Sequence, residues 1–266
     1  MQAWGAYLAI GAAVGFLAGL LGIGGGMVMV PLLALLFAAR GFAPEHVMHL
    51  ALGTAMASVV FTSIASVAAH HRHDAVDWPV ARAMAPGMAA GALGAALVAG
   101  LVPTRPLAAA FTVFLFFAAA RMMLESAQRP VGSLPGRGRL AAAGAAIGAL
   151  SSLLAAGGAF LTIPYLARRG VALKRSIGTA AASGFPIALA GTAGYILQGL
   201  RVEGLPEGAL GYVYLPALAL VVAASMPAAP LGARLAHRLP VRPLRILFAL
   251  VLLALALRML ARLWSA

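Results

Sequence analysis

The sequence has no cysteine, one lysine and only six acidic residues. The absence of cysteine excludes disulfides, thiolate metal sites and cysteine catalysis. No Gly-x-x-x-x-Gly-Lys-Ser/Thr loop is present, so ATP-driven pumping by this chain alone is not indicated. The acidic residues fall near predicted loops, away from the apolar spans, which argues against an enzyme. We therefore expect neither a cofactor nor a resident metal.

Long apolar runs make up most of the sequence. Of the 266 residues, 63% are hydrophobic and 9% are charged, whereas a soluble domain has about 25% charged residues. The mean hydropathy is +0.99, and the apolar runs reach the length of about 20 residues that a membrane span needs. The net charge of +13 fits loops that face anionic lipid, so a lipid bilayer is the expected partner and nucleic acid is not.

An internal repeat organises the chain. The glycine-rich segment Gly19–Pro31 returns in altered form as Ser152–Pro164. Breaks of this kind inside apolar segments free backbone groups in the bilayer, and they mark the binding sites of many transporters. Other pairs follow in the same order in both halves: Gly53-Thr54 with Gly178-Thr179, and Arg105-Pro106 with Arg242-Pro243. The sequence predicts a first membrane repeat over 1–127, a linker over 128–139 and a second membrane repeat over 140–266.

Each half is predicted to hold one broken segment and three helices, at 3–39, 46–69, 78–101 and 106–124, then 140–167, 173–198, 209–235 and 243–262. At 1.5 Å per residue the first segment would be about 55 Å long, against about 30 Å of hydrocarbon. It is therefore either a single broken crossing or a hairpin that turns at the glycines.

The distribution of basic residues favours hairpins. With single crossings, ten basic residues fall on one side and nine on the other. With hairpins, five fall on one side (Arg40, Arg105, Arg201, Arg258 and Arg262) and fourteen on the other, as the positive-inside rule expects. Hairpins also make the two halves insert in opposite orientations. We therefore expect an all-α integral membrane protein built as an inverted repeat, with both termini on the non-cytoplasmic side.

The segment Gly19–Gly26 followed by Val30-Pro31, the Gly53-Thr54 pair and the second copy of both resemble the TauE/SafE sulfite exporter family. The resemblance covers nearly the whole chain. It implies a multi-pass permease of the bacterial inner membrane that moves small sulfur-containing anions such as sulfite or sulfonates. The second copy departs from the family pattern, because it has alanine at Ala155, Ala156 and Ala159.

The glycine breaks are the first candidate binding site. A short helix beginning after each break would point its N-terminus into the protein, and free N–H groups and the helix dipole favour an anion there. The predicted residues are Gly24, Gly25, Gly26, Gly157 and Gly158. The structural alternative is close packing of helices through small residues.

Hydroxyl groups on the following helices are the second candidate. Thr54 and Ser58, and likewise Thr179 and Ser183, are four residues apart and share a helix face. They would coordinate anion oxygens, or instead bond to the backbone or across helices. Ser151, Ser152 and Thr162 flank the second break and are weaker candidates.

These features predict a secondary transporter for a small anion that works by alternating access around the broken helices, with H⁺ or Na⁺ as a coupling ion. An anion channel or a facilitator of a different substrate on the same scaffold is the alternative. His49 is either a proton-linked group or an interfacial histidine, and the cluster from His70 to Asp74 is read as a solvated loop.

Overall fold

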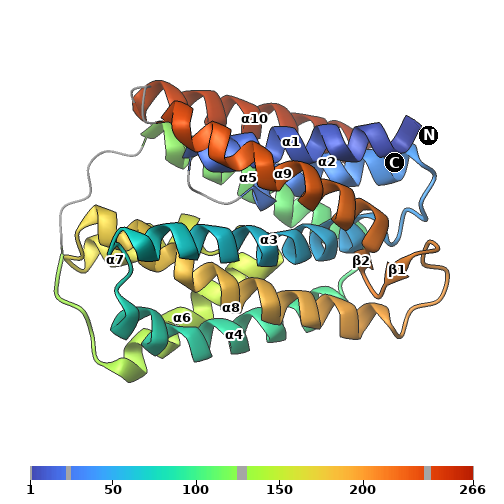
Figure 1. Cartoon of the computed structure of the whole chain (residues 1–266). Coiled ribbons are helices and arrows are strands. Elements are labelled where there is room, and N and C mark those ends of the chain that lie inside the picture. The colour runs from blue at the N-terminus through green and yellow to red at the C-terminus, as the bar shows by residue number, and fades with distance from the viewer. Residues whose placement is uncertain (1, 22–24, 125–130, 237–240, 266) are drawn as a thin grey trace.

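The computed structural model describes residues 2–21, 25–124, 131–236 and 241–265. Its helices run roughly parallel or antiparallel to one long axis (Figure 1). The first half holds α1 (Gln2–Leu21), α2 (Gly26–Ala39), α3 (Val47–Arg72), α4 (Trp78–Ala99) and α5 (Thr104–Leu124). The second half holds α6 (Arg137–Leu153), α7 (Ala159–Arg168), α8 (Leu173–Gly199), α9 (Leu215–Ala236) and α10 (Val241–Ser265).

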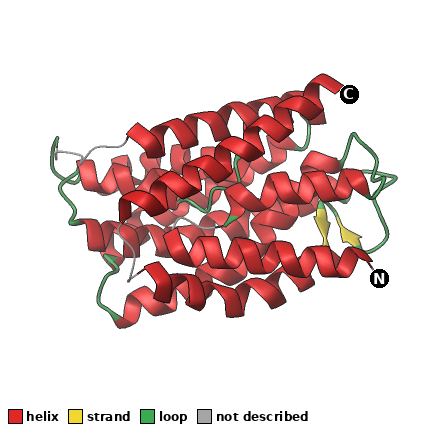
Figure 2. Cartoon of the chain, turned by 90° about the horizontal axis from the view of Figure 1, so that it is seen from above, coloured by secondary structure: helices red, strands yellow, loops and turns green. Residues whose placement is uncertain are grey.

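Six of the described helices, α3, α4, α5, α8, α9 and α10, are long and apolar enough to cross a membrane. This confirms the predicted class of an all-α membrane protein. The predicted helix over 209–235 begins later than expected, because residues 209–214 are not helical. There the strands β1 (Ala209–Leu210) and β2 (Val213–Tyr214) form a small antiparallel hairpin at one end of the bundle (Figure 2). Gly208 and Gly211 have φ of 83° and 55°, which turns the chain before α9 can begin.

Both broken segments fold back on themselves. Tyr7, near the start of α1, lies 6.3 Å from Phe37 near the end of α2, measured between ring centroids. Arg40, which follows α2, donates a hydrogen bond of 2.8 Å to the Tyr7 hydroxyl. In the second half the N–H of Val131, before α6, donates to the carbonyl of Arg168 at the end of α7, at 2.8 Å. The two arms of each segment thus begin and end on the same side, as in the predicted hairpins.

The first arm of each hairpin packs on the other half of the chain: α1 lies along α9, and α6 lies along α4. Small residues make both contacts possible. In the first contact, a Cβ at Gly11, Gly15 or Gly19 would overlap the backbone of Val221, Ser225 or Ala229. In the second, Gly144 and Gly148 approach Met84 and Met88 in the same way. The pairs α3–α8 and α5–α10 are also in contact across the two halves. This reciprocity is what a duplicated chain with inverted halves would produce; the inversion itself stays a prediction.

The described basic residues separate between the two ends of the bundle as the hairpin arrangement predicts. The end that carries β1 and β2 also holds both ends of the described chain (Figure 1). Five arginines belong to this end: Arg40, Arg105, Arg201, Arg258 and Arg262. The opposite end holds the starts of α4, α6, α8 and α10 and the remaining described basic residues. Arg129 and Arg238 lie outside the described residues. Which end faces the cytoplasm stays a prediction.

The lack of native cysteine makes this arrangement testable by single-cysteine labelling. Glu203, between α8 and β1, and Gly136, directly before α6, are exposed and lie at opposite ends of the bundle. In intact cells a membrane-impermeant maleimide should label Glu203→Cys, whereas Gly136→Cys should react only after permeabilisation, because we expect the arginine-rich end to face the cytoplasm. Labelling of both from the same side would contradict the hairpin fold. The reverse pattern would contradict the predicted orientation only.

Candidate functional site

The two breaks meet inside the bundle. Gly26, the first residue of α2, lies so close to Ala155 of the second break that a Cβ would overlap the Ala155 carbonyl oxygen. Ala155 and Ala156 are fully buried. One turn into α2, Met29 contacts Ser58, which lies near the middle of α3, so the meeting point is near the middle of the bundle. The structure therefore brings Gly25, Gly26, Gly157 and Gly158 into one region, while Gly24 lies outside the described residues.

The second break reverses the chain through left-handed backbone. Ala155, Gly157 and Gly158 have φ of 45°, 62° and 79°. Left-handed backbone costs a residue with a side chain about 1–2 kcal/mol, so Ala155 is held in an unfavourable conformation. A hydrogen bond from the Ala156 N–H to the Ser151 carbonyl, at 3.0 Å, helps to fix it. Such strain persists only where the surrounding structure imposes it, and it gathers at functional sites.

The N-terminus of α7 presents backbone donors to this region. The N–H groups of Leu161 and Thr162 both donate to the Gly158 carbonyl, at 3.2 and 2.9 Å. Among the described residues, the N–H groups from Gly157 to Phe160 make no backbone hydrogen bond. The first N–H groups of a helix carry partial positive charge and bind anions readily. The free N–H groups therefore make the electrostatic potential at the second break positive, although its residues carry no formal charge.

Three hydroxyls on residues that flank the second break have no hydrogen-bond partner in the part of the chain that the structure describes. They belong to Ser151, Ser152 and Thr162, each with 0% of its surface exposed. Thr192 of α8 carries a fourth such oxygen. A buried hydroxyl left unpaired costs about 1–3 kcal/mol, and most buried polar groups are paired for that reason. From sequence alone these three residues rank below Thr54 and Ser58 as candidate ligands of an anion. The structure reverses that order, because their hydroxyls are buried and unpaired among the described residues.

The predicted threonines have partners of another kind. The Thr54 hydroxyl accepts a hydrogen bond from the N–H of Tyr214 at 3.0 Å, and the Thr179 hydroxyl accepts one from Asp77 at 2.9 Å. Tyr214 directly precedes α9, and Asp77 directly precedes α4. Each threonine therefore holds the connection to a third long helix, one at each end of the bundle. The structure does not bring the two threonines together.

The glycine before each threonine takes part in the same contact. A Cβ at Gly53 would overlap the carbonyl of Tyr212, and a Cβ at Gly178 would overlap that of Ala75. The repeated Gly-Thr pair thus docks a connecting segment onto the helix. The glycine leaves room for a carbonyl of that segment, and the threonine hydroxyl accepts a hydrogen bond from the N–H of the residue two positions after that carbonyl. The sequence showed that the pair is repeated but gave no sign of its partners.

The two predicted serines bond locally. Ser58 donates to the Ala55 carbonyl at 2.7 Å and lies 3.0 Å from the Met29 sulfur, and Ser183 donates to the Thr179 carbonyl at 2.9 Å. These contacts match the backbone-bonding alternative. A role of either serine in binding a substrate stays a prediction.

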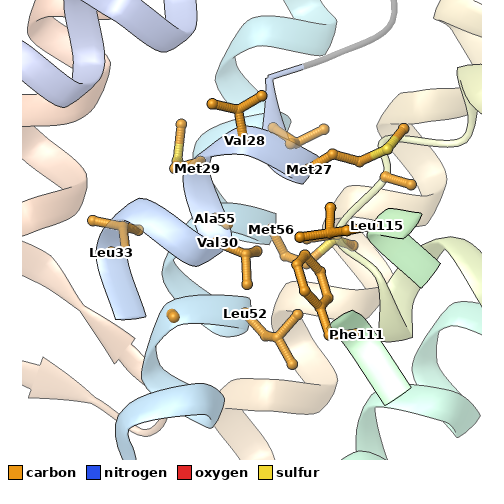
Figure 3. Close-up of a cluster of buried hydrophobic side chains, with 14 of the residues drawn as sticks. Met27, Val28, Met29, Val30, Leu33, Leu52, Ala55, Met56, Phe111 and Leu115 are labelled. Atoms are coloured by element: carbon orange, nitrogen blue, oxygen red, sulfur yellow. The ribbon is translucent and has the colours of Figure 1, made fainter. Parts of the chain in front are cut away.

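The first break differs from the second in its surroundings. Buried apolar side chains surround the start of α2, as Figure 3 shows, and they come from α2, α3 and α5. They include Met27, Val30, Leu52, Met56, Phe111 and Leu115. The structure thus pairs an apolar first break with a second break rich in hydroxyls.

His49 is buried near one end of the bundle, away from both breaks. Its Nε2 lies 3.1 Å from the Ala99 carbonyl and 3.0 Å from that of Val102, so it donates to the C-terminal end of α4. Its ring stacks on Tyr212 at 4.8 Å. These contacts give His49 a clear structural role. Among the described residues no three His, Cys, Asp or Glu side chains gather as a metal site would require.

Six membrane-length helices around two facing helix breaks define a multi-pass membrane protein with the architecture of a transporter. The profile of the family described as "Sulfite exporter TauE/SafE" matches residues 7–259. The chain belongs to this family, which confirms the resemblance seen in the sequence.

Two relatives agree with this assignment. The chain is 34% identical over 260 residues to a "Probable membrane transporter protein" of Haemophilus influenzae, covering 95% of this chain and 96% of the relative. It is 27% identical over 235 residues to "Probable membrane transporter protein YdhB" of Bacillus subtilis, covering 85% and 88%. No solved structure is significantly similar to the chain. The function that follows is membrane transport.

The contact between the breaks predicts that Gly26→Ala destabilises the protein. The added methyl group meets the Ala155 carbonyl, and overpacking of a core costs about 1–3 kcal/mol. The matched control is Gly94→Ala in α4, where a Cβ meets nothing within 4 Å and alanine favours the helix. The melting temperature of the purified protein should fall for Gly26→Ala and stay equal or rise for Gly94→Ala. Equal melting temperatures would contradict the close approach of the two breaks.

The docking role of the threonines predicts a loss of stability in Thr54→Val. The Tyr214 N–H loses its acceptor, at a cost of about 1–3 kcal/mol, whereas Thr54→Ser keeps the hydroxyl. Thr112→Val is the control, since the Thr112 hydroxyl bonds only within its own helix, to the Ala108 carbonyl at 2.7 Å. Thermal unfolding should separate Thr54→Val from both other variants. A Thr54→Val protein that is as stable as wild type but inactive would instead make Thr54 a substrate ligand.

Proposed function

We propose that the protein carries a small oxyanion of the sulfite or sulfonate class across the membrane and binds it at the second break. The observation that supports this most is that the residues flanking the second break, at the end of α6 and the start of α7, carry three buried hydroxyls without a partner among the described residues, on Ser151, Ser152 and Thr162. The family match points to the same class of substrate.

The chemistry of the second break suits an anion. Hydroxyl and backbone N–H groups donate hydrogen bonds to anion oxygens, and a bond to a charged group contributes about 1.5–3 kcal/mol. The dipole of α7 adds the equivalent of about half a positive charge at its N-terminus. Donors without a full positive charge bind an anion near the middle of the bilayer and still allow it to leave, as transport requires.

The first break supports the second in this proposal. Its residue Gly26 rests on the Ala155 carbonyl, so a movement of α2 is passed to the backbone that forms the site. Alternating access then follows from a displacement of the hairpins relative to α3 and α8, driven by a gradient of H⁺ or Na⁺. An anion channel on the same scaffold is the alternative, and it differs by showing no counter-transport.

The test is sulfite transport by purified protein in proteoliposomes. Ser152→Ala combined with Thr162→Val should raise the KM for sulfite at least about 10-fold, because two donors to a charged ligand are lost. The control is Ser225→Ala, which removes a buried hydroxyl that bonds to the Val222 carbonyl of its own helix at 3.3 Å. The control should transport as wild type does.

Two outcomes would contradict parts of this proposal. Unchanged sulfite kinetics in the double variant would remove the second break as the site. Sulfite flux that does not saturate, and that is not accelerated by sulfite on the opposite side, would favour the channel. Sulfate and taurine as competitors distinguish an inorganic oxyanion site from one that selects sulfonates.

A further inference from the structure

A crevice separate from the helix breaks opens between α5, α6 and α7. Its volume is about 1030 Å³, near the upper end of the range for sites that enclose a whole organic ligand and far more than a small inorganic anion needs. Its lining divides into a charged end and an apolar end. The charged end lies where α5 and α7 finish, and the apolar end reaches Leu150 and Leu161, within one turn of the second break.

Three arginines line the charged end: Arg121, Arg168 and Arg169. Two of them lie over aromatic rings, with the Arg121 guanidinium carbon 4.9 Å from the centroid of Phe160 and that of Arg169 5.7 Å from Tyr165. Rings hold guanidinium groups in place in this way. Among the described residues that line the crevice none is acidic. A guanidinium group matches the geometry and charge of a phosphate.

The apolar end faces the bilayer. Phe117 of α5 and Leu150 of α6 line the crevice, and about half of each side chain is exposed, at 54% and 50%. Phe117 lies within a helix long enough to span the membrane, so its exposed surface lies against hydrocarbon. A ligand in the crevice therefore has its charged part at the end of the bundle and its apolar part along the acyl chains.

We propose that this crevice binds an anionic phospholipid, with the phosphate at Arg168 and Arg169 and an acyl chain along Phe117 and Leu150. A phospholipid in one leaflet has this division of charge and apolar surface, and basic recesses between membrane helices suit lipid head groups. Each buried methylene adds about 0.8 kcal/mol, which a free phosphate lacks. The proposal is independent of the transported substrate.

Such a lipid would act on α7. This helix carries Arg168 at its last turn and Thr162 near its first, and it is only 10 residues long. A lipid held at Arg168 therefore anchors the helix whose N-terminus forms the proposed anion site. Because a ligand that binds the folded state stabilises it by mass action, the lipid should raise the melting temperature of the protein.

The test uses the full chain purified in a neutral detergent. Bound lipid is measured by native mass spectrometry, and unfolding is followed with added phosphatidylglycerol, phosphatidylcholine or glycerol 3-phosphate. Phosphatidylglycerol should bind and raise the melting temperature, while the other two have little effect. Arg168→Gln combined with Arg169→Gln should weaken phosphatidylglycerol binding at least 10-fold. The control, Arg72→Gln with Arg137→Gln, changes two exposed arginines at the same end that do not line the crevice and should bind as wild type does.

Three results would overturn the proposal. Equal binding of phosphatidylglycerol and phosphatidylcholine would mean that charge is not recognised. Equal stabilisation by glycerol 3-phosphate would make the crevice a site for free phosphate esters rather than lipid. Equal loss in both double variants would reduce the effect to net charge. If the Arg168/Arg169 variant is unstable, Ala146→Leu narrows the crevice from α6 and should weaken lipid binding with all arginines in place.

Discussion

Backbone hydrogen bonding in the bilayer is the constraint on which this structure depends. A helix break frees N–H and C=O groups that hydrocarbon cannot satisfy, so each break must be enclosed by protein. Here the second break is enclosed: Ala155 and Ala156 have no exposed surface, and Gly26 at the start of α2 rests on the Ala155 carbonyl. The second hairpin therefore uses the backbone of the first as part of its cover. The need to bury the breaks therefore requires both halves of the chain to fold as one unit.

The packing between the halves follows from the same need. Each hairpin reaches the centre along a helix of the other half, α1 along α9 and α6 along α4, through contacts that only small residues allow. The Gly-Thr pairs then fix the connections that lead into α9 and α4, through Thr54 with Tyr214 and Thr179 with Asp77. Each Gly-Thr pair thereby joins α3 or α8 to the start of the helix on which a hairpin packs. Each hairpin has its main contact with the opposite half, which is the coupling that the proposed alternating access needs.

Much of this fold could be read from the sequence, because composition and repetition are local signals. The membrane class, most helix bounds and the hairpin folding of the broken segments follow from apolar length, glycine position and arginine distribution. The partners of Thr54 could not be read, since its acceptor contact joins residues 160 positions apart in the chain. Ranking the candidate hydroxyl groups as ligands also required the three-dimensional structure. Thr54 and Ser152 are both hydroxyl residues within apolar segments, so the sequence does not distinguish them as ligands. Only packing decides that the Thr54 hydroxyl has a hydrogen-bond partner and that the Ser152 hydroxyl has none among the described residues.

The two breaks differ in the side chains that surround them. The first copy keeps its glycines, and the absence of a side chain at Gly26 lets α2 touch the backbone of the second copy. The second copy has alanine at Ala155, in a left-handed conformation that alanine disfavours, and it carries hydroxyl residues that the first copy lacks. A symmetric pair of glycine breaks would share the ligand equally between the halves. In this chain the first break contacts the backbone of the second, and the second is flanked by buried hydroxyls without a partner among the described residues, so the transport that we propose uses the first half as the support and the second as the site.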